Sequence, residues 1–144
     1  MEEVGLVFDN KNDALDLGRV LQLLDARIHP FAMYLFGSAA RGKLREDSDV
    51  DLAFLTDAAL TPYEQYLISQ EAAELLHREV DLVNLRTVET VFCAQIITHG
   101  RVLVNRDRER VASFQIRTLK EYALLNEERA MILKGIRDRG SFYA

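Results

Sequence analysis

The chain has 144 residues, of which 49% are hydrophobic and 28% are charged, and its formal net charge is -5. This length predicts a single domain over residues 1–144 with an apolar core, and it leaves little room for a separate substrate-recognition domain. The acidic balance argues against general nucleic-acid binding, because such binding normally needs an excess of Lys and Arg to replace the counterions around phosphates.

The single cysteine, Cys93, cannot form an internal disulfide, and no Cys/His group has the spacing of a zinc site. No apolar run approaches the roughly 20 residues needed to cross a bilayer, and the N-terminus lacks a basic region followed by an apolar one. We therefore expect a cytoplasmic protein. Cys93 is expected to be a buried small hydrophobe, and we assign no role to His29, His77 and His99.

Apolar spacing and turn residues predict alternating helices and strands. Helices are expected at 13–26, at 61–77, and between a cap at Thr87 and a stop at Gly100. In the second of these, Leu67, Ala72, Leu75 and Leu76 are available for burial. Strands are expected at 31–36, 50–55, 80–85 and 101–104. This order predicts an α/β domain.

A long helical segment is expected over 107–139, and the sequence leaves open a break within it. Its apolar residues form a broken stripe among many charges: Val111, Phe114, Tyr122, Leu125, Ile132 and Ile136. The simplest interpretation is a helix packed on the sheet. Its length, with Phe142 and Tyr143 at the end of the chain, leaves a contact with a partner or a second copy as the alternative.

Asp49 and Asp51 are two residues apart at the start of a predicted strand, so both carboxylates should lie on one face, roughly 6.6 Å apart at the backbone. Val50 and Leu52 should anchor the opposite face in the core. Two such charges raise one pKa unless a divalent cation compensates them, and magnesium prefers oxygen ligands of this kind.

Gly37 and Ser38 follow the strand expected at 31–36. A glycine there lets the backbone approach a phosphate, while the serine hydroxyl and nearby N–H groups donate hydrogen bonds. The residues 39–41 are expected to begin a short helix, with Arg41 as the nearest cation for phosphate; Lys43 and Arg45 are expected to face solvent. A role for Arg41 in a plain turn or ion pair remains the alternative.

An Asp-x-Asp pair alone is expected by chance about once in this chain, but a Gly-Ser pair at a fixed offset makes the accident rare, on the order of one in a thousand. The run from Leu35 to Leu52 resembles the signature of the polymerase-beta-like nucleotidyltransferases, which is Gly-Ser, ten residues, then Asp-x-Asp. Its Gly-Ser-x-Ala-Arg-Gly form looks like the MNT group, the minimal nucleotidyltransferases paired with HEPN toxins.

The resemblance implies a nucleotidyltransferase fold, a small mixed sheet with flanking helices and a long C-terminal helix. It also implies ATP as donor, two magnesium ions held by Asp49, Asp51 and a third carboxylate, and a tyrosine of a HEPN toxin that is AMPylated and silenced. Asp81 is the matching third carboxylate, although a polar residue that begins a strand is also ordinary.

Two other functions remain open at this point: transfer of a nucleotide to a small molecule such as an aminoglycoside, and a non-catalytic antitoxin that only binds its toxin. The absence of an added helical domain favours a protein acceptor over a small one. Homo-oligomers are also left open, as are the base preference and the number of nucleotides added.

Overall fold

The computed structural model describes residues 17–42 and 49–139, which form four helices and four strands. In chain order the elements are α1 (Leu17–Ile28), β1 (Ala32–Phe36), β2 (Val50–Leu55), α2 (Pro62–Leu76), β3 (Val80–Asn84), α3 (Thr90–His99), β4 (Arg101–Asn105) and α4 (Arg108–Asp138). The predicted α/β class is confirmed, and each strand lies within one residue of its predicted bounds. The expected start of the first helix at Asp13 lies outside the described residues.

The strands form one mixed sheet in the order β3-β2-β1-β4. β1 is antiparallel to both β2 and β4, whereas β2 and β3 are parallel and are joined through α2. The parallel register places Asp51 of β2 opposite Asp81 of β3, and the antiparallel register places Asp51 opposite Phe36 of β1. Residues from three strands therefore meet at the same end of the sheet.

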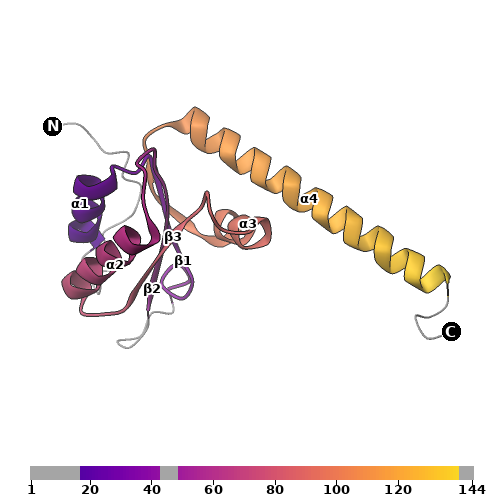
Figure 1. Cartoon of the computed structure of the whole chain (residues 1–144), viewed down its shortest axis with the longest axis horizontal. Helices are drawn as coiled ribbons and strands as arrows, with labels where there is room; N and C mark the ends of the chain where they lie inside the picture. Colours follow the sequence, from indigo (N-terminus) through magenta and orange to yellow (C-terminus); the bar gives the residue numbers. More distant parts are fainter. Residues whose placement is uncertain (1–16, 43–48, 140–144) are drawn as a thin grey trace.

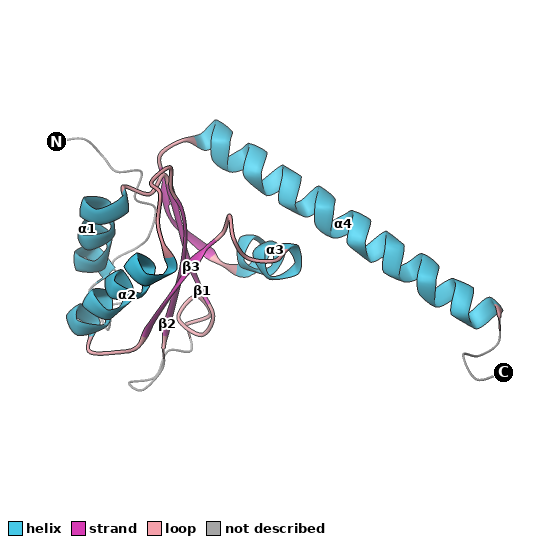
Figure 2. Cartoon of the chain, viewed as in Figure 1, coloured by secondary structure: helices cyan, strands magenta, loops and turns pink. Residues whose placement is uncertain are grey.

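Helices cover both faces of this sheet, with α1 and α2 on one face and α3 on the other (Figures 1 and 2). The first face buries Val50, Leu52 and Phe54 of β2 against α1 and α2. The second face buries Ala53 and Leu55 of β2 in a separate cluster that also contains side chains of α3 and α4. The alternation predicted for β2 is thus confirmed, and Asp51 shares the α3 face with Ala53.

Two details of the helices differ from the prediction. Thr87 does not cap α3: its hydroxyl donates to the Asn84 carbonyl in a turn, and the helix begins three residues later, with Glu89 as N-cap. In α2, Leu67 is 41% exposed and its neighbour Ile68 is buried instead. Ala72 and Leu76 are buried and Leu75 is half-buried, as predicted, so the spacing identified the buried side of α2 except at Leu67.

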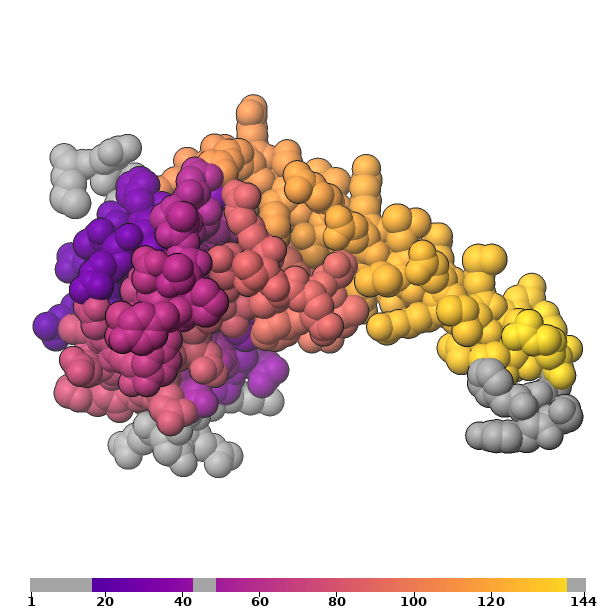
Figure 3. Space-filling model, in the orientation of Figure 1, coloured from indigo at the N-terminus to yellow at the C-terminus, as the bar shows by residue number. Residues whose placement is uncertain are grey.

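α4 begins at the end of the sheet far from Gly37. Its N-cap Asp107 accepts from the N–H of Arg110, and the preceding Arg106 pairs with Asp25 of α1 at 2.7 Å and donates to the Pro30 carbonyl at 2.8 Å. The helix is continuous over 31 residues, without a break. It packs against α3 and then extends beyond it, as an arm that stands clear of the body (Figures 1 and 3). The expectation of a helix packed on the sheet therefore holds only for its first part.

Candidate functional site

The turn after β1 lies directly against Asp51. Gly37 has φ +72°, a left-handed conformation that favours glycine, and a Cβ atom on it would overlap the Asp51 carboxylate. Two separate constraints, backbone conformation and space, therefore select glycine at this position. The sharp turn is what brings the backbone after β1 next to the carboxylate on β2.

Ser38 and Arg41 follow in two successive turns rather than in the short helix expected there. The N–H of Arg41 bonds the Ser38 carbonyl at 3.2 Å, and the N–H of Gly42 bonds the Ala39 carbonyl at 3.3 Å. Ser38 is half-buried and Arg41 is exposed. Lys43 and Arg45 lie outside the described residues. Glycines at both ends of this short segment, each with positive φ, prevent a regular helix from forming.

Asp51 and Asp81 are neighbours on adjacent strands, and Asp49 lies immediately before β2. Asp51 is half-buried, whereas the other two are exposed. Burial, a hydrogen bond with Asp81 and the charges of Asp81 and Asp49 together raise the pKa of Asp51 to about 6. The fold therefore holds Asp51 beside two further carboxylates that disfavour its ionisation.

These carboxylates provide only oxygen ligands, the type that a hard divalent cation such as magnesium prefers. In the described parts of the chain, no three carboxylate, imidazole or thiol side chains converge closely enough to hold one ion together. Asp51 and Asp81 form the centre of the cluster, because they are hydrogen-bonded to each other. Asp49 acts on Asp51 through the repulsion between their charges. This donor set fits a divalent cation, because a cation would relieve the repulsion that raises the Asp51 pKa.

Two hollows are lined by residues of the predicted site. One, of about 470 Å³, lies between the Gly37 turn and α3 and is lined by Phe36, Gly37, Arg41, Phe92, Gln95, Ile96 and His99. The other, of about 440 Å³, lies between α2 and the edge strand β3 and includes Asp81 in its lining. Spaces for two reactants are thus present, one beside the turn and one beside Asp81.

The first hollow contains residues that sequence reasoning missed. Phe36 and Phe92 pack edge to face, with ring centroids 5.8 Å apart and planes at 80°. His99, to which no role was assigned, also reaches this hollow. No motif identifies these residues, because they come together only where the end of β1 meets α3.

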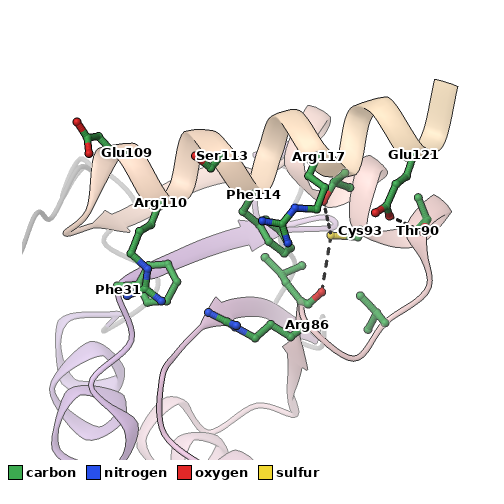
Figure 4. Close-up of a pocket in the computed structure, with 13 residues that line it drawn as sticks. Phe31, Arg86, Thr90, Cys93, Glu109, Arg110, Ser113, Phe114, Arg117 and Glu121 are labelled. Atoms are coloured by element: carbon green, nitrogen blue, oxygen red, sulfur yellow. Dashed lines mark hydrogen bonds between the residues drawn. The ribbon is translucent and has the colours of Figure 1, made fainter. Parts of the chain in front are cut away.

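A larger hollow, of about 680 Å³, lies at the other end of the sheet, between the β3–α3 connection and the first half of α4 (Figure 4). Arg110 stacks over the Phe31 ring at 3.9 Å and forms two hydrogen bonds to Asp57, at 2.6 and 2.9 Å. These contacts join α4 to the loop after β2, and they hold the pKa of Asp57 below its usual value. None of the predicted site residues lines this hollow.

Cys93 is buried in the interface of α3 with α4, as predicted for a small hydrophobe. Its Sγ lies 3.9 Å from both the Leu85 carbonyl oxygen and the Thr118 hydroxyl. Burial is the main reason that the pKa of its thiol is raised. In the part of the chain that the structure describes, no helix has both the length and the apolar composition to cross a membrane.

With this geometry in place, comparison with known proteins gives consistent matches. A family model described as Polymerase beta, Nucleotidyltransferase matches residues 19–109. The protein adenylyltransferase MntA of Shewanella oneidensis is 32% identical over 123 residues, which cover 85% of this chain and 88% of the relative.

Solved structures resemble the chain over the same extent. A chain from the crystal structure of a toxin–antitoxin with AMP-PNP superposes with a TM-score of 0.76 at 31% identity, covering 85% of this chain and 99% of that one. A chain from the complex of tri-AMPylated Shewanella oneidensis HEPN toxin with MNT antitoxin gives a TM-score of 0.68 at 30% identity, covering 83% and 94%. Each alignment leaves fewer residues of this chain uncovered than the 31 residues that α4 contains. Part of α4 therefore has a counterpart in both solved structures.

Proposed function

Because this chain belongs to the polymerase beta nucleotidyltransferase family, we propose that it transfers AMP from ATP to a tyrosine of a cognate HEPN-domain toxin. The modification silences the toxin, and the chain is thereby its antitoxin. Two relatives support this proposal: the similar MntA is a protein adenylyltransferase, and a structural neighbour was crystallised as an MNT antitoxin with an AMPylated HEPN toxin. The observation in this chain that carries it is the contact of the Gly37 turn with Asp51, beside Asp81.

We assign the binding of ATP to the Gly37 side of the carboxylates. In this proposal the backbone at Gly37 and the hydroxyl of Ser38 donate hydrogen bonds to the triphosphate, and Arg41 is a nearby exposed cation. Asp49, Asp51 and Asp81 would hold two magnesium ions. When bound, magnesium offsets the negative charge of the triphosphate and steadies the attacking and leaving oxygens of the phosphoryl transfer.

In the proposed reaction the acceptor approaches Asp81, which is exposed on the edge strand β3. The tyrosine oxygen forms a bond to the α-phosphorus of ATP, and the bond from that phosphorus to the pyrophosphate oxygen breaks. Asp81 accepts the phenolic proton, because it is the exposed carboxylate of the neighbouring pair and lies on the open side of Asp51. The products are the tyrosine adenylate and pyrophosphate.

We place this reaction in the cytoplasm, where HEPN toxins and ATP would both be present. The free thiol of Cys93, buried and without a disulfide partner, is compatible with a reducing compartment.

The direct test is the intact mass of the cognate HEPN-domain protein after incubation with this chain, magnesium and each NTP in turn. We expect adenylyl additions with ATP, and we expect D49N/D51N to add none. D57N is the matched control, because Asp57 is exposed at the opposite end of β2. If wild type adds no nucleotide while D49N/D51N still suppresses the toxin fully, the chain is a binding antitoxin rather than an enzyme.

A further inference from the structure

The second half of α4 has little packing within the chain. Within α4, all of which is described, the buried residues are Val111 and Thr118, and none follows Thr118. A helix of 31 residues is about 46 Å long, so a large part of it stands away from the body, as Figure 3 shows. A helix in a protein gains most of its stability from tertiary packing of an apolar face, and this part of α4 has little such packing.

The face that binds α3 continues beyond it as an apolar stripe. In the first half, Thr118 of α4 meets Cys93, and Glu121 lies 3.5 Å from the Thr90 hydroxyl at the start of α3. Beyond these contacts, residues at helical spacing continue the same face. We call them the distal stripe: Tyr122, Leu125, Ile132 and Ile136. Ile132 is 62% exposed and the other three residues are half-buried, so each leaves apolar area that a partner can cover.

The distal stripe lies on the same side of the sheet as the carboxylates. Ala53 and Leu55 of β2 share a buried cluster with Cys93 of α3 and Val111 of α4. Asp51 lies on the same face of β2 as Ala53, because alternate residues of a strand share a face. A protein seated against the distal stripe would therefore stand on the side of the molecule where Asp51 and Asp81 are presented.

We infer that the distal stripe is the docking surface for the HEPN-domain protein that this chain modifies. This inference rests on the proposed function. A protein acceptor must be held by more than its tyrosine, and the stripe offers apolar area on the correct side of the sheet. Part of α4 also has a counterpart in chains that were crystallised in toxin–antitoxin complexes.

A matched pair of double substitutions tests the stripe. L125E/I132E places two charges on the distal stripe. L124E/M131E places the same charges at the same spacing on the neighbouring exposed face, about 100° around the helix, where the original residues are 58% and 74% exposed. Both variants carry two added Glu residues. A difference in their affinity for the HEPN protein therefore depends on which face of α4 carries the charges.

The affinity of each variant for the HEPN protein is measured by calorimetry without ATP, and AMP-PNP binding shows that the nucleotide site is intact. We expect L125E/I132E to raise the Kd for the HEPN protein by about tenfold or more, while L124E/M131E stays within about twofold of wild type. AMP-PNP affinity should be unchanged in both.

Equal effects of the two variants on the Kd would overturn the inference. So would a wild-type dimer that L125E/I132E dissociates, measured by light scattering, with the affinity for the HEPN protein unchanged: the stripe would then pair two copies of this chain. Because binding is measured without transfer, a wild type that binds the HEPN protein but adds no nucleotide contradicts the proposed function and not the docking surface.

Discussion

Gly37 lies against Asp51 so closely that a Cβ atom on the glycine would overlap the carboxylate of the aspartate. The two residues are 14 positions apart in the sequence, and they meet because β1 and β2 are antiparallel neighbours with Phe36 opposite Asp51. The turn that is proposed to bind phosphate and the carboxylate that is proposed to bind magnesium therefore form one structure. A change at Gly37 should affect both.

Gly37→Ala should reduce both activity and stability, and Gly42→Ala is its matched control. The two glycines have nearly the same φ, +72° and +68°, but among the described residues a Cβ at Gly42 would meet nothing within 4 Å. We expect G42A to lower the free energy of unfolding by about 1 kcal/mol, the cost of a left-handed conformation. G37A should cost more and should abolish adenylylation, because Asp51 must move. Urea unfolding and the mass assay measure the two effects, and equal losses in both variants would contradict the contact with Asp51.

Asp51→Asn should stabilise the protein at high pH in metal-free buffer. The folded-state pKa of about 6 exceeds the model-peptide value of 3.8, so the folded protein binds this proton more tightly than the unfolded chain. Stability from this group is therefore fully present below about pH 4 and is lost as the pH rises through 6. The advantage of D51N over wild type should grow over that range to about 1 kcal/mol, after allowance for solvent screening of a half-exposed group.

Thermal unfolding of both proteins in EDTA from pH 4 to pH 8 measures this difference, which should reach roughly 3 °C in Tm. A constant difference across the range would show that Asp51 titrates near its ordinary pKa in the folded protein.

Chelation should stop adenylylation. If carboxylates hold the magnesium, EDTA removes the charge compensation that the triphosphate needs, and added magnesium restores it. The measurement is the intact mass of the HEPN protein with EDTA, and then with excess magnesium. Labelling that survives EDTA would count against a metal site at Asp49, Asp51 and Asp81.

Cys93 should react slowly with thiol reagents in the folded protein. Burial between α3 and α4 excludes the reagent and raises the pKa of the thiol, so little thiolate is present at neutral pH. We expect the rate of release of chromophore from a disulfide reagent to increase by orders of magnitude in denaturant. A fast reaction in native buffer would show that α4 opens from α3 readily.

Thr61→Ala should destabilise α2. The Thr61 hydroxyl accepts from the N–H of Glu64 at 3.1 Å, and the Glu64 carboxylate accepts from the N–H of Thr61 at 3.4 Å, which together form a capping box. We expect a loss of about 1 kcal/mol in the free energy of unfolding, measured in urea. T61S retains the hydroxyl and should stay close to wild type; an equal loss in T61S would assign the effect to the methyl group instead.

Local sequence information determined the elements and the candidate motif. Strands such as β2 were predictable because their apolar residues alternate. The fixed offset from Gly37-Ser38 to Asp49 and Asp51 indicated a candidate phosphate and metal site rather than a chance pair of aspartates. α2 was predictable from Thr61-Pro62, since the cap and the fixed φ of proline act within one helical turn. These features depend on neighbours along the chain.

Only the tertiary structure decided which distant residues meet. The pairing of β2 with β3 placed Asp81 beside Asp51, and the packing of α3 on β1 brought Phe92 to Phe36. α4 is a second example. Its spacing predicted a helix, but it did not predict that the last buried residue of the helix would be Thr118 or that the distal stripe would remain uncovered. Periodicity reports which face of a helix is apolar, whereas the surface that covers that face is set by contacts between segments far apart in sequence.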